Sequence, residues 1–105
     1  MWVFLWLKIN IIIKYNVIIM KKIMYSEYKS DMGILIDVQH PLDYKENPTP
    51  NSKNIYADKL LMSYKVLLDK SKKYFIICNK GTLSGRVVAM LEYLGYDVTQ
   101  VLKDN

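Results

Sequence analysis

Apolar residues gather in short runs along the chain, and these runs predict the strands of a β-sheet. The clearest runs are Ile34–Val38, Tyr74–Cys78 and Val98–Leu102, and Lys53–Tyr56 is predicted as a shorter strand. No polar residue interrupts Tyr74–Cys78, which indicates a strand buried on both faces. We expect this run to be the central strand of the sheet.

Between these strands, apolar residues recur at intervals of three and four, which is the spacing of one helix face. Asp58–Leu68 and Ser84–Leu94 are the predicted long helices, and Pro41–Glu46 is a short helix whose proline suits the first turn. Gly95 is expected to end the last helix as a C-terminal cap. The apolar positions of the two long helices are Leu60, Leu61, Tyr64, Leu67 and Leu68, then Val87, Val88, Met90, Leu91 and Leu94.

This alternation of strands and helices predicts an α/β fold, with a parallel sheet covered by helices on both faces. The chain has 105 residues, of which 51% are hydrophobic, so there is material for one domain with a single core. We place this domain at residues 22–105.

Residues 1–21 form a hydrophobic and basic N-terminal extension whose lysines and asparagines leave apolar runs too short to span a bilayer. The extension also lacks a small-residue cleavage site for secretion. Two interpretations remain open. Residues 1–20 either anchor or pack on something, so that membrane contact is expected only through them, or they reflect an upstream start assignment, with translation beginning at Met20 or Met24. We favour the second interpretation.

The positive charge of the chain does not predict a nucleic-acid partner. The formal net charge is +5, but residues 1–23 hold four lysines and no acid, and the other 82 residues hold 11 cations and 10 acids. Residues 24–105 therefore carry only +1. The domain also lacks a basic stripe with interleaved aromatic residues, so we expect no nucleic-acid binding.

Cys78 stands where the predicted central strand gives way to a loop that contains Gly81. Ser84 is expected to cap the following helix, so the thiol would face a helix N-terminus at the carboxyl end of a strand. Free N–H groups there favour an anion, and Lys80 would help to keep the thiol ionised. Cys78 is therefore a candidate nucleophile. From position alone, burial as a small hydrophobic residue is an equally good interpretation.

Cys78 is also the only cysteine, which limits the other chemistries open to the chain. An internal disulfide is impossible, and a reducing compartment such as the cytoplasm is expected. His40 and Cys78 are the sole strong nitrogen and sulfur ligands, so no zinc site is predicted. A role of His40 as a catalytic base is a minor alternative to a place in a strand-to-helix turn.

Four segments in order resemble the rhodanese family, and together they cover roughly residues 22 to 102. The first looks like the family's opening strand with its Asp-Val pair, the second like its His-Ile-Pro-Gly-Ala segment, the third like its active-site loop and the fourth like its closing Gly-Tyr-x-Val strand. These segments are Ile34–Gln39 with Pro41 and Tyr44, Pro50–Ile55, Cys78–Arg86, and Gly95–Val98.

The resemblance implies a three-layer sandwich with a central, mostly parallel sheet, and a sulfurtransferase that needs no cofactor or metal. Cys78 would receive a sulfane sulfur as a persulfide, from a small anionic donor or a protein persulfide, and pass it to a thiol or another thiophilic acceptor. The N–H groups of the loop would stabilise the persulfide anion. Thr82 and Ser84 would offer hydroxyl groups and Leu83 would line the pocket mouth, although Thr82 and Leu83 serve equally well as loop filler. The implied loop residues are Asn79, Lys80, Gly81, Thr82, Leu83 and Ser84.

Several positions depart from the family pattern. Asn79 and Leu83 stand where many members have arginine, and Gln39 replaces the usual arginine after the first strand. Lys80 is then the only fixed cation of the loop. Because a lysine is a point charge and an arginine binds oxyanions through two parallel bonds, thiosulfate should be held less well than in other members. A protein persulfide is the more plausible donor.

Arg86 leaves two interpretations open. It lies two residues beyond the position that phosphatases with a similar loop need for their arginine, where this chain has Ser84, so phosphatase activity is not expected. Arg86 would either be exposed or, as the resemblance implies, form a structural ion pair with Asp37.

Two alternatives to a sulfurtransferase remain. The missing loop arginines favour a catalytically weak or inactive module that binds a partner. Cys78 could also act as a redox sensor through a sulfenate, which would need an external thiol.

Overall fold

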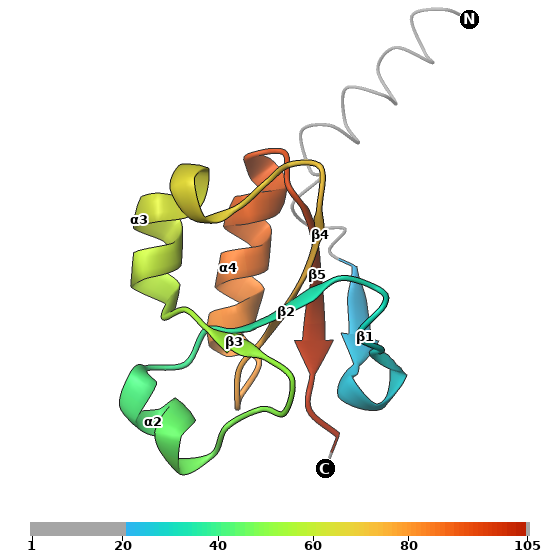
Figure 1. The fold of residues 1–105 in the computed structure, drawn as a ribbon, viewed down its shortest axis with the longest axis vertical. Coiled ribbons are helices and arrows are strands. Elements are labelled where there is room, and N and C mark those ends of the chain that lie inside the picture. The colour runs from blue at the N-terminus through green and yellow to red at the C-terminus, as the bar shows by residue number, and fades with distance from the viewer. Residues whose placement is uncertain (1–20, 105) are drawn as a thin grey trace, which may run out of the picture.

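The computed structural model describes residues 21–104 and shows one five-stranded sheet in which every neighbouring pair of strands is parallel. The strand order across the sheet is β1-β5-β4-β2-β3 (Figure 1). The strands are β1 (Lys22–Met24), β2 (Ile34–Asp37), β3 (Lys53–Asn54), β4 (Lys73–Ile77) and β5 (Asp97–Leu102). Since parallel strands end at the same edge, the loops after β2 and β4 meet there.

Two α-helices lie side by side on one face of the sheet (Figure 1). They are α3 (Ala57–Leu67) and α4 (Thr82–Tyr93), and the short helix α2 (Pro41–Glu46) follows β2 at the carboxyl edge. Near the other face, the described chain has the single 3₁₀ turn η2 (Tyr25–Glu27). The predicted α/β class and parallel sheet are confirmed, but within residues 21–104 the second face is covered by β1 and η2 residues instead of the predicted α-helix.

The core is divided by the sheet because successive residues of a strand point to opposite faces. The larger part lies under α3 and α4 and contains Ile36, Val38, Ile55, Ala57, Leu60, Leu68, Tyr74, Ile76, Cys78, Val87, Val88, Leu91, Tyr96 and Val98. The smaller part contains Leu35, Phe75, Ile77 and Val101, covered by Ile23, Tyr25 and Tyr28. Strand β4 contributes to both parts, which confirms its prediction as the buried central strand.

The start of α4 differs from the prediction. The helix begins at Thr82, and the capping residue is Gly81, whose φ of 81° lies in the left-handed region that favours glycine. Ser84 is thus the third helical residue rather than the cap. The predicted end is confirmed, because Gly95 has a φ of 93° and its N–H donates to the Glu92 carbonyl at 3.0 Å.

Strand β1 was not predicted from the sequence. It is three residues long, only its middle residue Ile23 is partly buried, and it pairs with β5 at the edge of the sheet. Such a short edge strand carries too little alternation of apolar and polar residues to be recognised.

No helix among residues 21–104 is long and apolar enough to cross a membrane. Both interpretations of residues 1–20 concern a segment that lies outside the described residues.

Candidate active site

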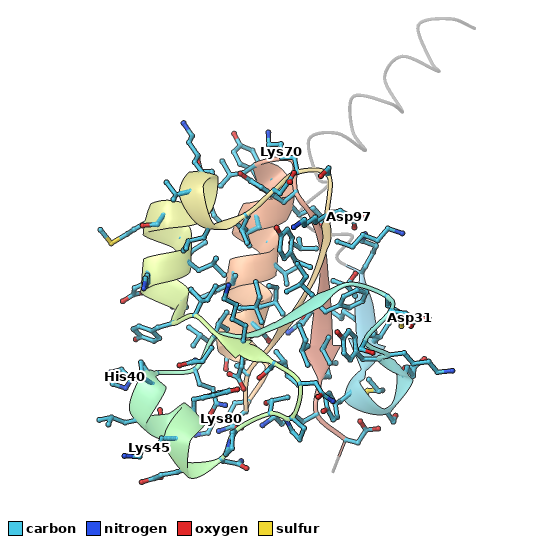
Figure 2. All side chains as sticks on the ribbon, viewed as in Figure 1. Asp31, His40, Lys45, Lys70, Lys80 and Asp97 are labelled. Atoms are coloured by element: carbon cyan, nitrogen blue, oxygen red, sulfur yellow. The ribbon has the colours of Figure 1, made fainter. Side chains whose placement is uncertain are left out.

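A pocket of about 470 Å³ opens at the carboxyl edge of the sheet, where the loops after β2 and β4 meet. Figure 2 shows His40, Lys45 and Lys80 at this end of the molecule and Lys70 and Asp97 at the opposite end. The pocket is lined by Gln39, His40, Asp43, Tyr56, Cys78, Asn79, Lys80, Thr82 and Leu83. The structure therefore brings Cys78 and four of the six predicted loop residues to one pocket.

The thiol of Cys78 lies at the base of this pocket, and the residue is only 3% exposed. Its Sγ accepts a hydrogen bond of 3.1 Å from the backbone N–H of Ser84, in the first turn of α4. The first N–H groups of a helix have no partner within the helix, and they carry the positive end of its dipole. The sulfur of Cys78 thus lies at the positive end of the α4 dipole.

The backbone of the loop after Cys78 is held in place by three hydrogen bonds to one carbonyl oxygen, that of Gly81. The Gly81 oxygen accepts from the Gly85 N–H at 3.0 Å, from the Ser84 hydroxyl at 3.2 Å and from the Gln100 side-chain amide at 2.7 Å. The same Gln100 nitrogen donates to the Ser84 hydroxyl at 3.1 Å. Ser84 is fully buried, so its hydroxyl supports the loop and its backbone N–H contacts the sulfur.

The rim beside Cys78 contains a hydrogen-bonded chain that ends at Asp37, which is fully buried. The Asp37 carboxylate accepts from the Gln39 backbone N–H at 3.0 Å, from the Gln39 side-chain amide at 2.8 Å and from the Thr49 hydroxyl at 2.6 Å. Asn79 donates its amide to the Gln39 side-chain oxygen, and Lys103 donates to the Asn79 oxygen. Asn79 and Gln39, two of the departures from the family pattern noted in the sequence, are therefore bonded to each other.

The ion pair between Asp37 and Arg86 does not form, which corrects that interpretation. All donors to the Asp37 carboxylate are uncharged, and Arg86 is exposed on α4, beside Leu61, Ala89 and Tyr93. Among residues 21–104 the only ion pair joins Lys21 and Asp97. A buried carboxylate needs several hydrogen bonds, and Gln39 and Thr49 supply them here.

Lys80 and His40 lie on opposite parts of the pocket lining. Lys80 is exposed and has no hydrogen bond or ion pair to residues 21–104, so its charge faces solvent and the pocket. The Nδ1 atom of His40 accepts the Leu42 N–H at 3.2 Å as a cap of α2, and its ring meets the Tyr56 ring edge-on at 5.2 Å. His40 therefore lies in the strand-to-helix turn, as predicted from the sequence.

Sequence reasoning missed Asp43, Tyr56 and Gln100 as parts of the site. Asp43 and Tyr56 line the pocket and Gln100 holds the loop. The sequence did hold a signal for Asp43. It lies in α2, which directly follows β2 at the carboxyl edge of the sheet, and that edge is where ligands bind. Among residues 21–104, no cluster of His, Cys, Asp or Glu could hold a metal ion.

Two carboxyl groups with a shifted pKa, those of Glu92 and Asp104, lie away from the pocket. Burial raises the pKa of Glu92 above its usual value, with Lys21 opposing the shift, and one of its oxygens has no hydrogen-bond partner. Hydrogen bonds from Ser26 lower the pKa of Asp104. Neither group faces Cys78.

A parallel α/β sheet with a cysteine at its carboxyl edge, facing a helix N-terminus, defines a thiol-containing anion site. The sequence model of the rhodanese-like domain matches residues 20–104. This chain belongs to the rhodanese-like domain family, whose members often have sulfurtransferase activity.

Solved structures agree with this assignment. A rhodanese-related protein from Thermoplasma volcanium is 27% identical, with a TM-score of 0.71 over 78% of this chain and 83% of that one. A rhodanese-like domain protein from Staphylococcus aureus is 28% identical, with a TM-score of 0.67 over 79% and 85%. A single-domain sulfurtransferase of Saccharomyces cerevisiae, 16% identical, shares the fold at a TM-score of 0.50 over 76% and 82%. No curated protein sequence matches the chain.

Proposed function

We propose that this protein is a sulfurtransferase that carries sulfane sulfur as a persulfide on Cys78 and passes it to a thiophilic acceptor. The observation that carries the proposal is the hydrogen bond of 3.1 Å from the Ser84 N–H to the Cys78 Sγ, at the base of an open pocket. A thiol with only a packing role gains nothing from facing a helix N-terminus and a pocket of this size.

The reaction proceeds in two displacements. In the first, the Cys78 thiolate attacks the outer sulfur of a donor, a new S–S bond forms, and the donor's own S–S bond breaks. The donor thiolate, or sulfite from thiosulfate, leaves with the electron pair. In the second, a thiolate or cyanide attacks the terminal sulfur and Cys78 leaves as a thiolate. Sulfur and electrons balance across the two steps, so no cofactor is required.

The loop residues divide the work between binding and shape. Backbone N–H groups between Asn79 and Ser84 stabilise the terminal sulfur anion, and Gly81 permits the tight turn that aims them. Lys80 attracts anionic donors. Thr82 and Leu83 line the pocket. The Ser84 hydroxyl supports the loop rather than donating to the substrate, because it is bonded to Gly81 and Gln100.

A protein persulfide is the donor that suits this rim best. Asn79 and Gln39 fill the positions of two arginines with neutral amides that bond each other, which leaves Lys80 as the cation of the loop. A dianionic donor such as thiosulfate lacks a bidentate partner here, whereas a persulfide presents a single negative sulfur. A free catalytic thiol also fits the reducing cytoplasm as the place of action.

The test is the intact mass of the full chain after incubation with thiosulfate or with a persulfide donor. We expect a gain of one sulfur, removal of that sulfur by cyanide, and no gain in Cys78→Ser. A folded protein that takes up no sulfur from any donor would refute the proposal, and would leave partner binding without catalysis as the function of the domain.

A further inference from the structure

We propose that Gln100 is a positioning residue for the persulfide loop, because its side-chain amide fixes the peptide group between Gly81 and Thr82. The inference rests on the proposed function of Cys78. Gln100 lies in β5, is 4% exposed and is not among the residues that line the pocket. It acts on Cys78 through the loop.

A buried glutamine in a strand requires an explanation. On its face of β5, Val98 is apolar and buried and Leu102 is apolar and partly buried, and an amide without partners costs free energy in such surroundings. Gln100 pairs in register with Ile76 of β4, two residues before Cys78. From there its amide nitrogen reaches the loop and makes the bonds to Gly81 and Ser84 at 2.7 and 3.1 Å. Both of its N–H groups are used on the loop.

The bond from Gln100 is the shortest of the three that hold the Gly81 oxygen, and these bonds set where the next N–H points. Because the peptide is trans, the Gly81 oxygen and the Thr82 hydrogen point in opposite directions. Because the Gly81 oxygen is held towards Gln100, the Thr82 N–H points away from β5. It points out of the N-terminal end of α4, where Thr82 lines the pocket. An oxygen that accepts several donors also polarises its own peptide, which makes that N–H a better donor.

The two glycines of the loop fit this contact. A side chain added at Gly85 would place its Cβ 3.3 Å from the Gln100 amide nitrogen, and one at Gly81 would place it at 3.8 Å. The absence of a side chain at Gly85 thus lets the amide approach the first turn of α4. The loop glycines and the buried glutamine are complementary in shape.

The experiment measures the rate at which Cys78 in the full chain reacts with a dipyridyl disulfide, which modifies thiols over a wide pH range. Gln100→Met keeps the length of the side chain and removes the donor. We expect its rate at pH 7 to fall about three- to tenfold, the effect of losing the bond to the Gly81 oxygen, because the other lost bond, to the Ser84 hydroxyl, does not orient the Thr82 N–H. The matched control is Thr99→Val on the opposite face of β5, with a rate within about twofold of the wild type. Thermal melts establish that each variant is folded.

Gln100→Glu supplies a signature that a merely structural role would not produce. A protonated carboxyl group can donate to the Gly81 oxygen and a carboxylate cannot, so the reaction rate should show an extra decrease as the new carboxyl group ionises. A folded Gln100→Met that reacts like the wild type, or a Gln100→Glu pH profile that parallels the wild type, would overturn the inference. If Gln100→Met does not fold, the Gln100→Glu profile decides.

Failure of the proposed function would be recognised separately. Sulfur uptake by the wild type is measured by mass, without reference to Gln100. If the wild type takes up no sulfur and the variants still change the reactivity of Cys78, sulfur transfer is refuted and Gln100 still positions the thiol loop.

Discussion

Replacing Asp37 by asparagine is expected to destabilise the protein by breaking the hydrogen-bonded chain at the pocket rim. Every link of this chain has a fixed direction. Lys103 donates to Asn79, Asn79 donates to Gln39, and Gln39 donates to Asp37, which also accepts from Thr49. The chain begins at a cation and ends at a fully buried carboxylate that accepts three bonds. An asparagine has the same shape but only one accepting oxygen.

The magnitude follows from counting donors. If the asparagine oxygen takes the place that accepts from the Gln39 amide and Thr49, its NH₂ group faces the Gln39 backbone N–H and leaves that buried donor without a partner. In the opposite orientation, its NH₂ group faces the Gln39 amide, and turning that amide would break the bond from Asn79. The first orientation leaves one buried donor without its acceptor and the second leaves two, the Gln39 amide and the Thr49 hydroxyl, so at least one is lost at a cost of about 1–3 kcal/mol.

The assay is urea unfolding of the full chain, followed by circular dichroism. With a slope of about 1–2 kcal/mol per molar for a domain of this size, the midpoint of Asp37→Asn should fall by roughly 0.5–3 M. Asp31→Asn is the matched control, because Asp31 is exposed, and its free energy of unfolding should change by less than about 0.5 kcal/mol. An Asp37→Asn midpoint equal to that of the wild type would show that the buried carboxylate is not the anchor of this chain.

Three further predictions concern the loop and the far end of α4. Gly81→Ala forces a side chain into a left-handed conformation and places a Cβ 3.3 Å from Leu102, so the free energy of unfolding should fall by about 1–2 kcal/mol in a thermal or urea melt. Lys80→Ala should slow sulfur uptake from an anionic donor severalfold at low salt, and the difference from the wild type should vanish at high salt in a stopped-flow assay. Burial raises the pKa of Glu92, so its ionisation removes stability as the pH rises through that pKa. Glu92→Gln should therefore melt higher than the wild type near pH 7 and equally below about pH 4, and a difference that persists at low pH would contradict this reasoning.

Much of the fold follows from local patterns in the sequence. The apolar run at β4 predicts its place at the centre of the sheet, and the spacing of apolar residues places α3 and α4 within two residues of their observed starts. These elements are recognisable because each buries a continuous stripe, which fixes the period of its apolar positions. The pocket follows from the same patterns, since Cys78 comes at the end of a buried parallel strand.

The rest depends on contacts between residues far apart in the chain. Ser84 looks like a helix cap, yet Gly81 caps α4 because the loop turns through a left-handed residue that its neighbours hold in place. The family resemblance implies an ion pair between Arg86 and Asp37, but Gln39 and Thr49 already satisfy that carboxylate. No local pattern in the sequence predicts such partners.

The position of β5 between β1 and β4 has a consequence for the order in which the molecule is assembled. A parallel sheet contains no hairpins, so each pair of neighbouring strands waits for a crossover, and β5 is the last strand of the described chain to be synthesised. Until β5 leaves the ribosome, β1 has no partner and β4 is an open edge. The Cys78 loop also lacks Gln100 during that time. The loop beside the Cys78 thiol therefore gains its hydrogen bonds from β5 only when this strand joins the sheet.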